Sequence, residues 1–233
     1  ISKGLYAKAE LLNPTGSIKD RPASWILSFG GFDGDKYDTI CEATSGNMGV
    51  SFAWLAATLG CKCVIIMPNN MSEERKKTLE FYGAQLIEVE AGDFDAAIEM
   101  RDKLCEERGW FNCNQFANDW NIEAHHMTTA VEIIDWAAEE RKDISAVVTG
   151  TGTGGTLMGC HRRLKPQFPK MKMVAVEPAE SAVMSGGEAG VHGIQGIGDG
   201  SKFLVDMECV DYISVISTED AKARARELAK THG

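Results

Sequence analysis

Residues 37–67 read YDTICEATSGNMGVSFAWLAATLGCKCVIIM, and this stretch carries the clearest signal of the fold class. Strand-forming residues at 37–41 lead through a polar loop into a nearly all-apolar helix at 47–59, and a buried strand follows at 61–67. Two strands joined by a helix of this length form a parallel βαβ unit. The stretch therefore predicts an α/β fold built on a parallel sheet.

The same alternation continues on both sides of this stretch. Further helices are predicted at 20–29, 72–83, 94–105, 129–138, 155–164 and 217–230. Further strands are predicted at 5–10, 84–89, 110–113, 145–148 and 171–176, and residues 181–202 read as a glycine-rich loop. No Pro-rich or Ser-rich linker separates the early units from the later ones, so we expect two closely packed α/β lobes that the chain crosses.

Length and composition exclude several classes of protein. The 233 residues are 44% hydrophobic and 25% charged, values of an ordinary globular protein rather than of a disordered, collagen-like or coiled-coil chain. The net charge of −10, without a basic stripe, argues against nucleic acid or an anionic membrane as partner. The most apolar window, 48–67, is interrupted by Gly60 and Lys62 and fits a helix plus a strand better than a membrane span.

The cysteine and histidine residues predict a reduced protein without a metal site. Seven cysteines form no CxxC pair, and their odd number favours an intracellular, cytoplasmic setting over a disulfide framework. The five histidines do not combine with cysteines at zinc-ligand spacing. The adjacent His125 and His126 are interpreted as structural, because neighbouring residues on a helix point about 100° apart.

Residues 13–22, NPTGSIKDRP, place a lysine at the start of a predicted helix. The positive end of the helix dipole disfavours an ammonium there, so the pKa of Lys19 is expected to be lowered. An amine that is neutral near pH 7 can act as a nucleophile and form an imine. The alternative is a solvated lysine beside Asp20.

The loop at 42–49, EATSGNMG, joins the first strand of the βαβ unit to its helix. Thr44, Ser45 and Asn47 offer hydroxyl and amide groups beside the unpaired N–H groups of the helix start. Such a combination binds carboxylates or phosphates. Plain capping of the helix is the alternative interpretation.

The loop at 149–156, TGTGTGGT, follows a strand and opens a helix, a position where backbone amides can bind a phosphate. Gly150, Gly152 and Gly155 also satisfy GxGxxG, and Glu177 ends the next strand, where a dinucleotide fold places its ribose-binding acid. An NAD-dependent dehydrogenase therefore stays open as an alternative.

Two weaker candidates complete the set. Residues 192–200, HGIQGIGDG, contain four glycines that would let the backbone approach a ligand, and Gln115 follows a predicted strand. A nucleophilic lysine together with one phosphate loop favours pyridoxal 5′-phosphate (PLP), with the aldehyde on Lys19 and the phosphate on the glycine loop. A nicotinamide enzyme has no use for the Lys19 segment.

Six motifs now support a family resemblance. They are NPTGSIKDRPA at 13–23, EATSGNMG at 42–49, NQFAND at 114–119, GTGTGGTLMG at 150–159, AVEPAES at 175–181 and HGIQGIGDG at 192–200. In this order they resemble the cysteine synthases (O-acetylserine sulfhydrylases), with cystathionine β-synthase as a close relative. The resemblance covers essentially the whole chain, and it implies a fold type II PLP enzyme, similar to the tryptophan synthase β subunit, with two open α/β lobes of mainly parallel twisted sheets.

The resemblance also implies roles for individual residues. Lys19 matches the Schiff-base lysine and is the catalytic residue, and Asn47 matches the asparagine that binds the ring oxygen of the cofactor. The residues that match the phosphate site are Gly152, Thr153, Gly154, Gly155 and Thr156. Those that match the substrate-binding loops are Thr44, Ser45, Gly46, Asn47, Met48, Gln115, Gly196 and Ile197.

The activity implied is PLP-dependent β-replacement. O-acetylserine, or a related activated serine, would lose its leaving group to give an aminoacrylate, and sulfide would add to form L-cysteine. Lys19 would serve as imine partner and as acid and base. Alternatives within the family are cystathionine synthase, diaminopropionate synthase and dehydratase, and an inactive binding module is a more distant one. The resemblance further suggests a homodimer and raises serine acetyltransferase as a partner.

The resemblance divides the chain into lobes and marks where it departs from the family. Residues 1–21 and 121–233 would form a large PLP-binding lobe, and 22–120 a small mobile lobe that closes on the substrate. Met48 stands where the family usually has threonine. The serine that faces the pyridine nitrogen would lie beyond Gly233, and the usual first strand is not found, so we expect the chain to be truncated at both ends.

Overall fold

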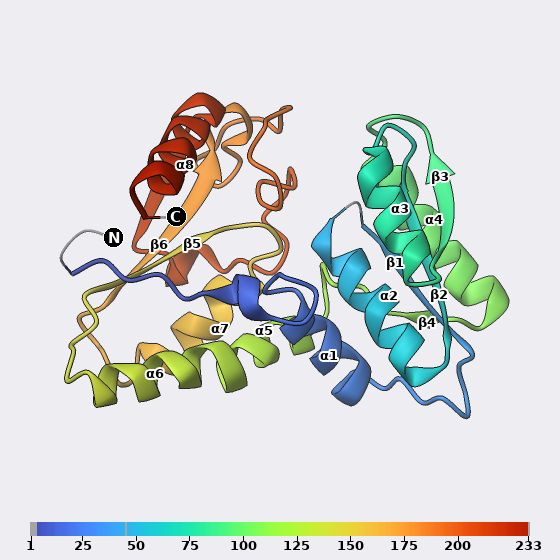
Figure 1. Ribbon diagram of the computed structural model, residues 1–233, viewed down its shortest axis with the longest axis horizontal. Coiled ribbons are helices and arrows are strands. Elements are labelled where there is room, and N and C mark those ends of the chain that lie inside the picture. The colour runs from blue at the N-terminus through green and yellow to red at the C-terminus, as the bar shows by residue number, and fades with distance from the viewer. Residues whose placement is uncertain (1–3, 45, 233) are drawn as a thin grey trace. The chain divides into compact units, whose positions relative to one another are not determined.

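The computed structural model describes residues 4–44 and 46–232 (Figure 1). They form two compact units, one of residues 10–121 and one of residues 4–9 with 122–232, named here the 10–121 unit and the 122–232 unit. Each unit contains its own parallel sheet. The predicted α/β class is therefore confirmed in both units. The predicted roles of the lobes, in cofactor binding and in closure, stay predictions.

The 10–121 unit contains a four-stranded sheet in the order β3-β2-β1-β4. Its strands are β1 (Thr39–Ala43), β2 (Lys62–Pro68), β3 (Gln85–Val89) and β4 (Phe111–Asn112). Its helices are η1 (Glu10–Leu12), α1 (Asp20–Phe29), α2 (Asn47–Leu59), α3 (Glu73–Phe81) and α4 (Phe94–Arg108), and α5 (Asp119–Ala124) leads out of the unit. All described strand pairs in this sheet are parallel.

Alternate residues of β1 and β2 enter two separate cores, one on each face of this sheet. Ile40 and Ile65 pack in a cluster with Phe52 of α2. Cys41 and Val64 pack in a second cluster on the α4 side, together with Ala97 and Cys105. Because both faces are covered, β1 is buried along its whole length, including its charged residue Glu42.

The 122–232 unit contains a three-stranded parallel sheet in the order β5-β6-β7. Its strands are β5 (Ala146–Gly150), β6 (Lys172–Pro178) and β7 (Tyr212–Ile216). Its helices are α6 (Ala130–Glu139), α7 (Gly155–Leu164), α8 (Thr218–His232) and the short η3 (Ala179–Ser181) and η4 (Met207–Cys209). The core lies between the sheet and helices α6 and α7, around Leu157, Leu164, Met171 and Met173.

The sequence Thr129-x-x-Glu132 matches a capping box and so predicts a helix start at Thr129, but this prediction is wrong. α5 continues through one π-helical turn, η2 (His125–Thr129), directly into α6, and Thr129 has helical backbone angles. Its side chain caps no backbone N–H of α6; its hydroxyl pairs with the imidazole of His125 instead. By contrast, Ser217 caps the last helix: its hydroxyl accepts from the N–H of Asp220 at 3.1 Å and donates to the Asp220 carboxylate at 2.7 Å.

The predicted strand at 5–10 is also wrong. Described residues 5–9 have no regular secondary structure, and the chain turns into η1 at Glu10. Leu5 and Tyr6 are more than half exposed, and Tyr6 packs its ring on Trp136 of α6 at 4.7 Å. An isolated apolar alternation thus covers a helix here instead of adding to a sheet.

Within the part of the chain that the structure describes, no helix is long and apolar enough to cross a membrane.

Candidate active site

Lys19 lies immediately before α1, with a half-buried side chain and helical backbone angles of φ −69° and ψ −18°. Its N–H donates to the hydroxyl of Ser17 at 3.2 Å, and its carbonyl accepts from Ala23 at 3.1 Å. The lysine therefore belongs to the first turn of the helix, as the sequence predicted.

The loop that carries Lys19 is held by the next residue. Asp20 is 5% exposed, and its carboxylate accepts hydrogen bonds from the N–H of Thr15 at 2.7 Å and from the Thr15 hydroxyl. It also accepts from the hydroxyl of Ser51, in the second turn of α2, at 2.6 Å. One buried carboxylate thus joins the lysine loop to α2.

The start of α2 presents backbone donors. Thr44 is buried after β1, where its N–H donates to Ile66 at 3.0 Å and its hydroxyl accepts from the N–H of Gly46 at 3.2 Å. Gly46 is the N-cap of α2 and has no side chain to occupy the first-turn N–H groups. Asn47 is exposed at the first helical position. An anionic group would be stabilised at this helix end.

Met48 and Ser45 are the other side chains predicted to bind the substrate from this loop. Met48 is 2% exposed, and its side chain packs in the apolar core with Phe52. A contact from Met48 to a carboxylate would therefore have to come from its backbone N–H. Ser45 lies outside the described residues.

Gln115 is placed by a buried ion pair. Its N–H donates to Oε2 of Glu42 at 2.9 Å, and its carbonyl accepts from the side chain of Asn121 at 2.9 Å. The other oxygen of Glu42 accepts from Arg101 at 3.0 Å, and both side chains are at most 2% exposed. Burial raises the pKa of the Glu42 carboxyl, and the Arg101 guanidinium acts against that rise. The Gln115 loop is thereby fixed beside the end of β1.

The glycine-rich loop of the 122–232 unit runs from Gly150, at the end of β5, to the start of α7. A Cβ at Gly154 would lie 2.5 Å from Cγ2 of Val205, and one at Gly152 would lie 3.0 Å from Oδ2 of Asp199. Gly154 also has a φ of +92° as the N-cap of α7. The cap residue Gly154 has no side chain, and the first-turn N–H of Gly155 lies 3.5 Å from the Thr153 hydroxyl; such a helix start suits a phosphate.

The second glycine-rich segment lies against this loop. The N–H of Gly198 donates to the carbonyl of Thr151 at 2.9 Å, and a Cβ at Gly150 would lie 2.9 Å from Cγ2 of Ile197. The structure thus brings the predicted residues Gly196 and Ile197 beside the predicted phosphate loop. The two segments form one glycine-lined surface of the same unit.

The NAD-dependent dehydrogenase alternative requires Glu177 to bind a ribose, but the carboxylate of Glu177 is already occupied. Glu177 is 1% exposed, and its carboxylate accepts from the N–H groups of Met184 at 2.8 Å and Ser185 at 3.0 Å, and from the Ser185 hydroxyl. These bonds fix the turn at 182–187. Glu177 is therefore a structural group of β6, and a GxGxxG interpretation has no free ribose acceptor at this position.

The predicted residues form two groups. Lys19, Thr44, Asn47 and Gln115 belong to the 10–121 unit, and residues 152–156 with Gly196 and Ile197 belong to the 122–232 unit. Sequence reasoning missed the groups that hold them, chiefly Glu42 and the Glu42 partner Arg101. A glutamate inside an otherwise apolar strand was the available signal, because such a charge is almost never buried unless it is paired.

The residues present fit pyridoxal phosphate. A lysine at a helix start can bind its aldehyde, and the glycine loop, packed too closely on Val205 and Asp199 to carry a Cβ, presents bare backbone at the start of α7. Among residues 4–44 and 46–232, no group of three or more His, Cys, Asp or Glu residues able to hold a metal ion occurs.

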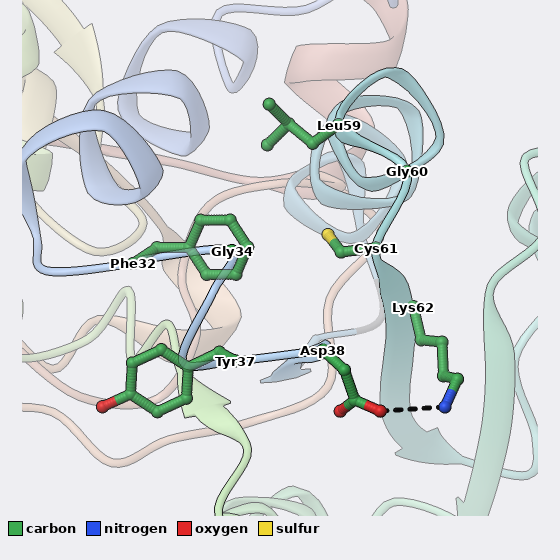
Figure 2. A pocket seen from close by; sticks show the side chains of 8 residues that line it. All are labelled: Phe32, Gly34, Tyr37, Asp38, Leu59, Gly60, Cys61 and Lys62. Atoms are coloured by element: carbon green, nitrogen blue, oxygen red, sulfur yellow. Dashed lines mark hydrogen bonds and ion pairs between the residues drawn. The ribbon is translucent and has the colours of Figure 1, made fainter.

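A hollow of about 390 Å³ lies at the amino ends of β1 and β2 in the 10–121 unit, away from the loops that follow these strands (Figure 2). Its lining residues are Phe32, Gly34, Tyr37, Asp38, Leu59, Gly60, Cys61 and Lys62. Lys62 and Asp38 form an exposed ion pair at 2.9 Å beside it. Because these residues precede β1 and β2 or, for Lys62, begin β2, the hollow lies at the amino ends of the strands, whereas ligands of α/β sheets bind at the carboxyl ends.

Comparisons with known proteins support pyridoxal phosphate as the cofactor. The family model described as "Pyridoxal-phosphate dependent enzyme" matches residues 1–233. A cysteine synthase of Staphylococcus aureus is 40% identical over 235 residues, which cover 98% of this chain and 74% of that protein.

Two solved structures show the same fold. The crystal structure of O-ureido-L-serine synthase is similar with a TM-score of 0.91 and 35% identity, over 97% of this chain and 72% of that one. A cysteine synthase from Entamoeba histolytica gives a TM-score of 0.87 and 38% identity, over 96% of this chain and 67% of that one. The chain therefore belongs to the family of pyridoxal-phosphate dependent enzymes, in its fold type II branch.

Proposed function

We propose that this enzyme makes L-cysteine from O-acetylserine, or a related activated serine, and sulfide by β-replacement. The observation that carries the proposal is the link between two predicted elements of the site. The buried Asp20 carboxylate joins the turn that bears Lys19 to α2, whose N-terminus offers donors for a substrate carboxylate. The similarity to cysteine synthases supports the choice of reaction.

Lys19 has two tasks in this proposal. Its Nζ would hold the aldehyde group of PLP, and the same amine would accept the proton from Cα of the substrate and later return it. The bound cofactor supplies the electron sink that makes the Cα proton acidic. Because Asp20 fixes the backbone on both sides of Lys19, the amine is returned to the same place after each transfer.

The loops after β1 and β4 bind the amino acid. Thr44, Asn47 and the first-turn N–H groups of α2 would hold the substrate carboxylate, and Gln115 would contact it from the loop that Glu42 fixes. Ser45, Gly46 and Met48 stay predictions for the same group. The phosphate is assigned to residues 152–156, and Gly196 and Ile197 are assigned to the substrate side of that loop.

The visible spectrum of the purified protein, before and after O-acetylserine, tests the proposal. We expect the yellow band of lysine-bound PLP, a shift on adding O-acetylserine, and cysteine release on adding sulfide. Lys19→Ala should abolish the band and the product, whereas Lys77→Ala, which removes an exposed lysine of α3, should change neither. A Lys19→Ala variant that still turns over would overturn the assignment of the lysine.

The second substrate needs its own assay, because it enters after the leaving group has departed. Sulfide, homocysteine and amine acceptors should be supplied separately at equal concentration. We expect sulfide to give the highest kcat/KM. A higher value with homocysteine or an amine would reassign the enzyme to cystathionine or diaminopropionate synthesis within the same family.

We also propose a homodimer in the cytoplasm. Support comes from the family resemblance and from seven free cysteines, which a reducing compartment would keep as thiols. Light scattering of the purified protein tests the oligomeric state. Serine acetyltransferase is a proposed partner on the same grounds, and co-elution with it is the corresponding measurement.

A further inference from the structure

A buried histidine lies directly behind the predicted phosphate loop. His125 is 1% exposed and begins the π-helical turn η2. Its Nδ1 lies 2.9 Å from the hydroxyl oxygen of Thr129, and its Nε2 lies 3.3 Å from that of Thr156, in the first turn of α7. All three residues belong to the 122–232 unit.

The packing around His125 fixes its distance from α7. A Cβ at Gly159 would lie 2.5 Å from the carbonyl oxygen of Ile122 and 2.6 Å from Cβ of His125. α7 therefore touches the π-helical turn through bare backbone. π-Helical turns inside α-helices occur frequently at functional sites, because they turn a side chain out of the regular register. Here the turn directs the imidazole toward Thr156.

The hydrogen bonds of this group admit two arrangements. A neutral imidazole has one N–H donor and one nitrogen acceptor. If Nε2 carries the proton, it donates to Thr156, and the hydroxyl proton of Thr156 is directed away from the histidine. If Nδ1 carries it, the Thr156 hydroxyl donates to Nε2 and has no proton left for a ligand.

Thr129 can serve as the hydrogen-bond donor to the unprotonated ring nitrogen of His125. The hydroxyl of Thr129 can donate to Nδ1, which leaves the proton on Nε2. The chain of donors then runs from Thr129 to His125, from His125 to Thr156, and from Thr156 outward. Because Thr156 stands in the first turn of α7, its outward proton faces the anion site of that helix.

We propose that His125 is a positioning residue for the phosphate of the cofactor: its Nε2–H holds the Thr156 hydroxyl so that this hydroxyl donates to a phosphate oxygen. The inference rests on the proposed phosphate role of residues 152–156. It separates His125 from an ordinary core histidine, which would contribute to packing alone. The group recognised is the phosphate monoester of the cofactor, and the pyridine ring of the cofactor is not involved.

Binding of two probes to the apoprotein tests this. PLP carries the phosphate and pyridoxal lacks it, and each can be titrated by its visible band. His125→Leu removes the donor at similar volume, whereas Gln in His125→Gln can place an N–H near the position of Nε2. We expect His125→Leu to raise the Kd of PLP about tenfold, the effect of losing one charge-assisted hydrogen bond, and to leave the Kd of pyridoxal unchanged. His125→Gln should restore most of the PLP affinity.

A double-mutant cycle identifies the route. Thr156→Val alone should weaken PLP binding by at least as much as His125→Leu, and His125→Leu should have no further effect in the Thr156→Val background. If His125→Leu does not fold, as judged by circular dichroism of the apoprotein, His125→Gln and Thr156→Val still test the same coupling.

The outcomes separate the two proposals. Equal loss of PLP and pyridoxal affinity in His125→Leu, or additive effects of the two substitutions, would overturn the positioning role and leave His125 as a packing residue. A wild-type apoprotein that binds PLP no better than pyridoxal would instead overturn the phosphate assignment of residues 152–156. Proper discrimination by the wild type, lost only in His125→Leu and Thr156→Val, supports both.

Discussion

Each of the two units has a buried glutamate near the carboxyl end of a central strand, and each glutamate anchors a returning segment of chain. Glu42 is the penultimate residue of β1, and Glu177 is the penultimate residue of β6. Each strand is a central strand of its sheet, and each carboxylate is at most 1% exposed. Each accepts backbone N–H groups from a segment that returns to the end of the strand, at Gln115 in one unit and at Met184 and Ser185 in the other.

The two carboxylates differ in what balances their charge. Glu42 faces the buried guanidinium of Arg101, whereas the three donors described for Glu177 are neutral groups. A buried ion pair must offset the desolvation of both ions, and it leaves an uncompensated charge when one partner is removed. One anchoring geometry can therefore have very different tolerance to substitution, depending on whether a second charge is buried with it.

The largest effect should come from Arg101→Met. The substitution leaves Glu42 buried without its cation, and we expect the free energy of unfolding to fall by roughly 3–5 kcal/mol, measured by urea denaturation. Burial raises the pKa of the Glu42 carboxyl in the folded state, so the folded state binds a proton here more tightly than the unfolded state. Protonation of Glu42 therefore stabilises the fold at low pH, and this stabilisation is lost as the pH rises through the folded pKa. The deficit of Arg101→Met should therefore shrink as the pH is lowered.

The double variant Glu42→Gln with Arg101→Met is the matched control. It removes both charges and keeps an acceptor for the Gln115 N–H, so it should be more stable than Arg101→Met alone. A double variant that is less stable than Arg101→Met would contradict the interpretation that the unpaired carboxylate causes the loss.

A smaller effect is expected in the other unit. Glu177→Ala leaves the N–H groups of Met184 and Ser185 without their acceptor, which should cost about 2 kcal/mol, and faster hydrogen exchange should be confined to residues 182–187. Glu177→Gln keeps one carbonyl oxygen and should lose less. An equal loss in both variants would show that charge, and not acceptor count, matters at this site.

Acid stability should depend on a third carboxylate, which is only partly buried. Asp211 accepts from the N–H of Met173 and from Lys172 and Lys165, and these bonds lower the pKa of its carboxyl, that of Met173 most. A lowered pKa stabilises the fold above the unfolded value, about 3.9, and this contribution is lost as the pH falls through the folded pKa. Asp211→Asn should therefore lose less stability than the wild type between about pH 5 and pH 3, measured by thermal unfolding.

The smallest effect should come from Ser185→Ala. It removes one of three donors to Glu177, at an exposed residue, and both backbone donors stay in place. We expect a loss of about 0.5 kcal/mol. A loss as large as that of Glu177→Ala would mean that the hydroxyl, rather than the backbone, holds the turn at 182–187.

The sequence predicted the elements whose signals are local. Helices 20–29, 47–59 and 155–164 begin and end where periodicity and glycines indicated. β7 was missed, because Tyr212–Ile216 is a short edge strand whose outer residues are solvated. The π-helical turn was missed because Thr129 and Glu132 match a capping pattern, and only contact with α7 favours the alternative.

The site followed the same rule. Lys19, the loop at 44–48 and the glycines at 152–155 could be predicted, because loop chemistry and helix starts lie in continuous sequence. The groups that hold them were not found, because Glu42 and Gln115 are 73 residues apart and Asp20 and Ser51 are 31 apart. Such pairs form only when the sheet has assembled, and no local pattern encodes them.

The cysteines beside β1 have a practical consequence. Cys41, Cys63, Cys105 and Cys113 are buried in the 10–121 unit, and Cys160 is buried in the 122–232 unit. Burial keeps alkylating reagents away from Cys63 and Cys113. Burial also raises the pKa of both thiols, which lowers the fraction of reactive thiolate. The rate at which a reagent modifies each cysteine, read by mass spectrometry, would therefore time the opening of each unit separately, with no probe added to the chain.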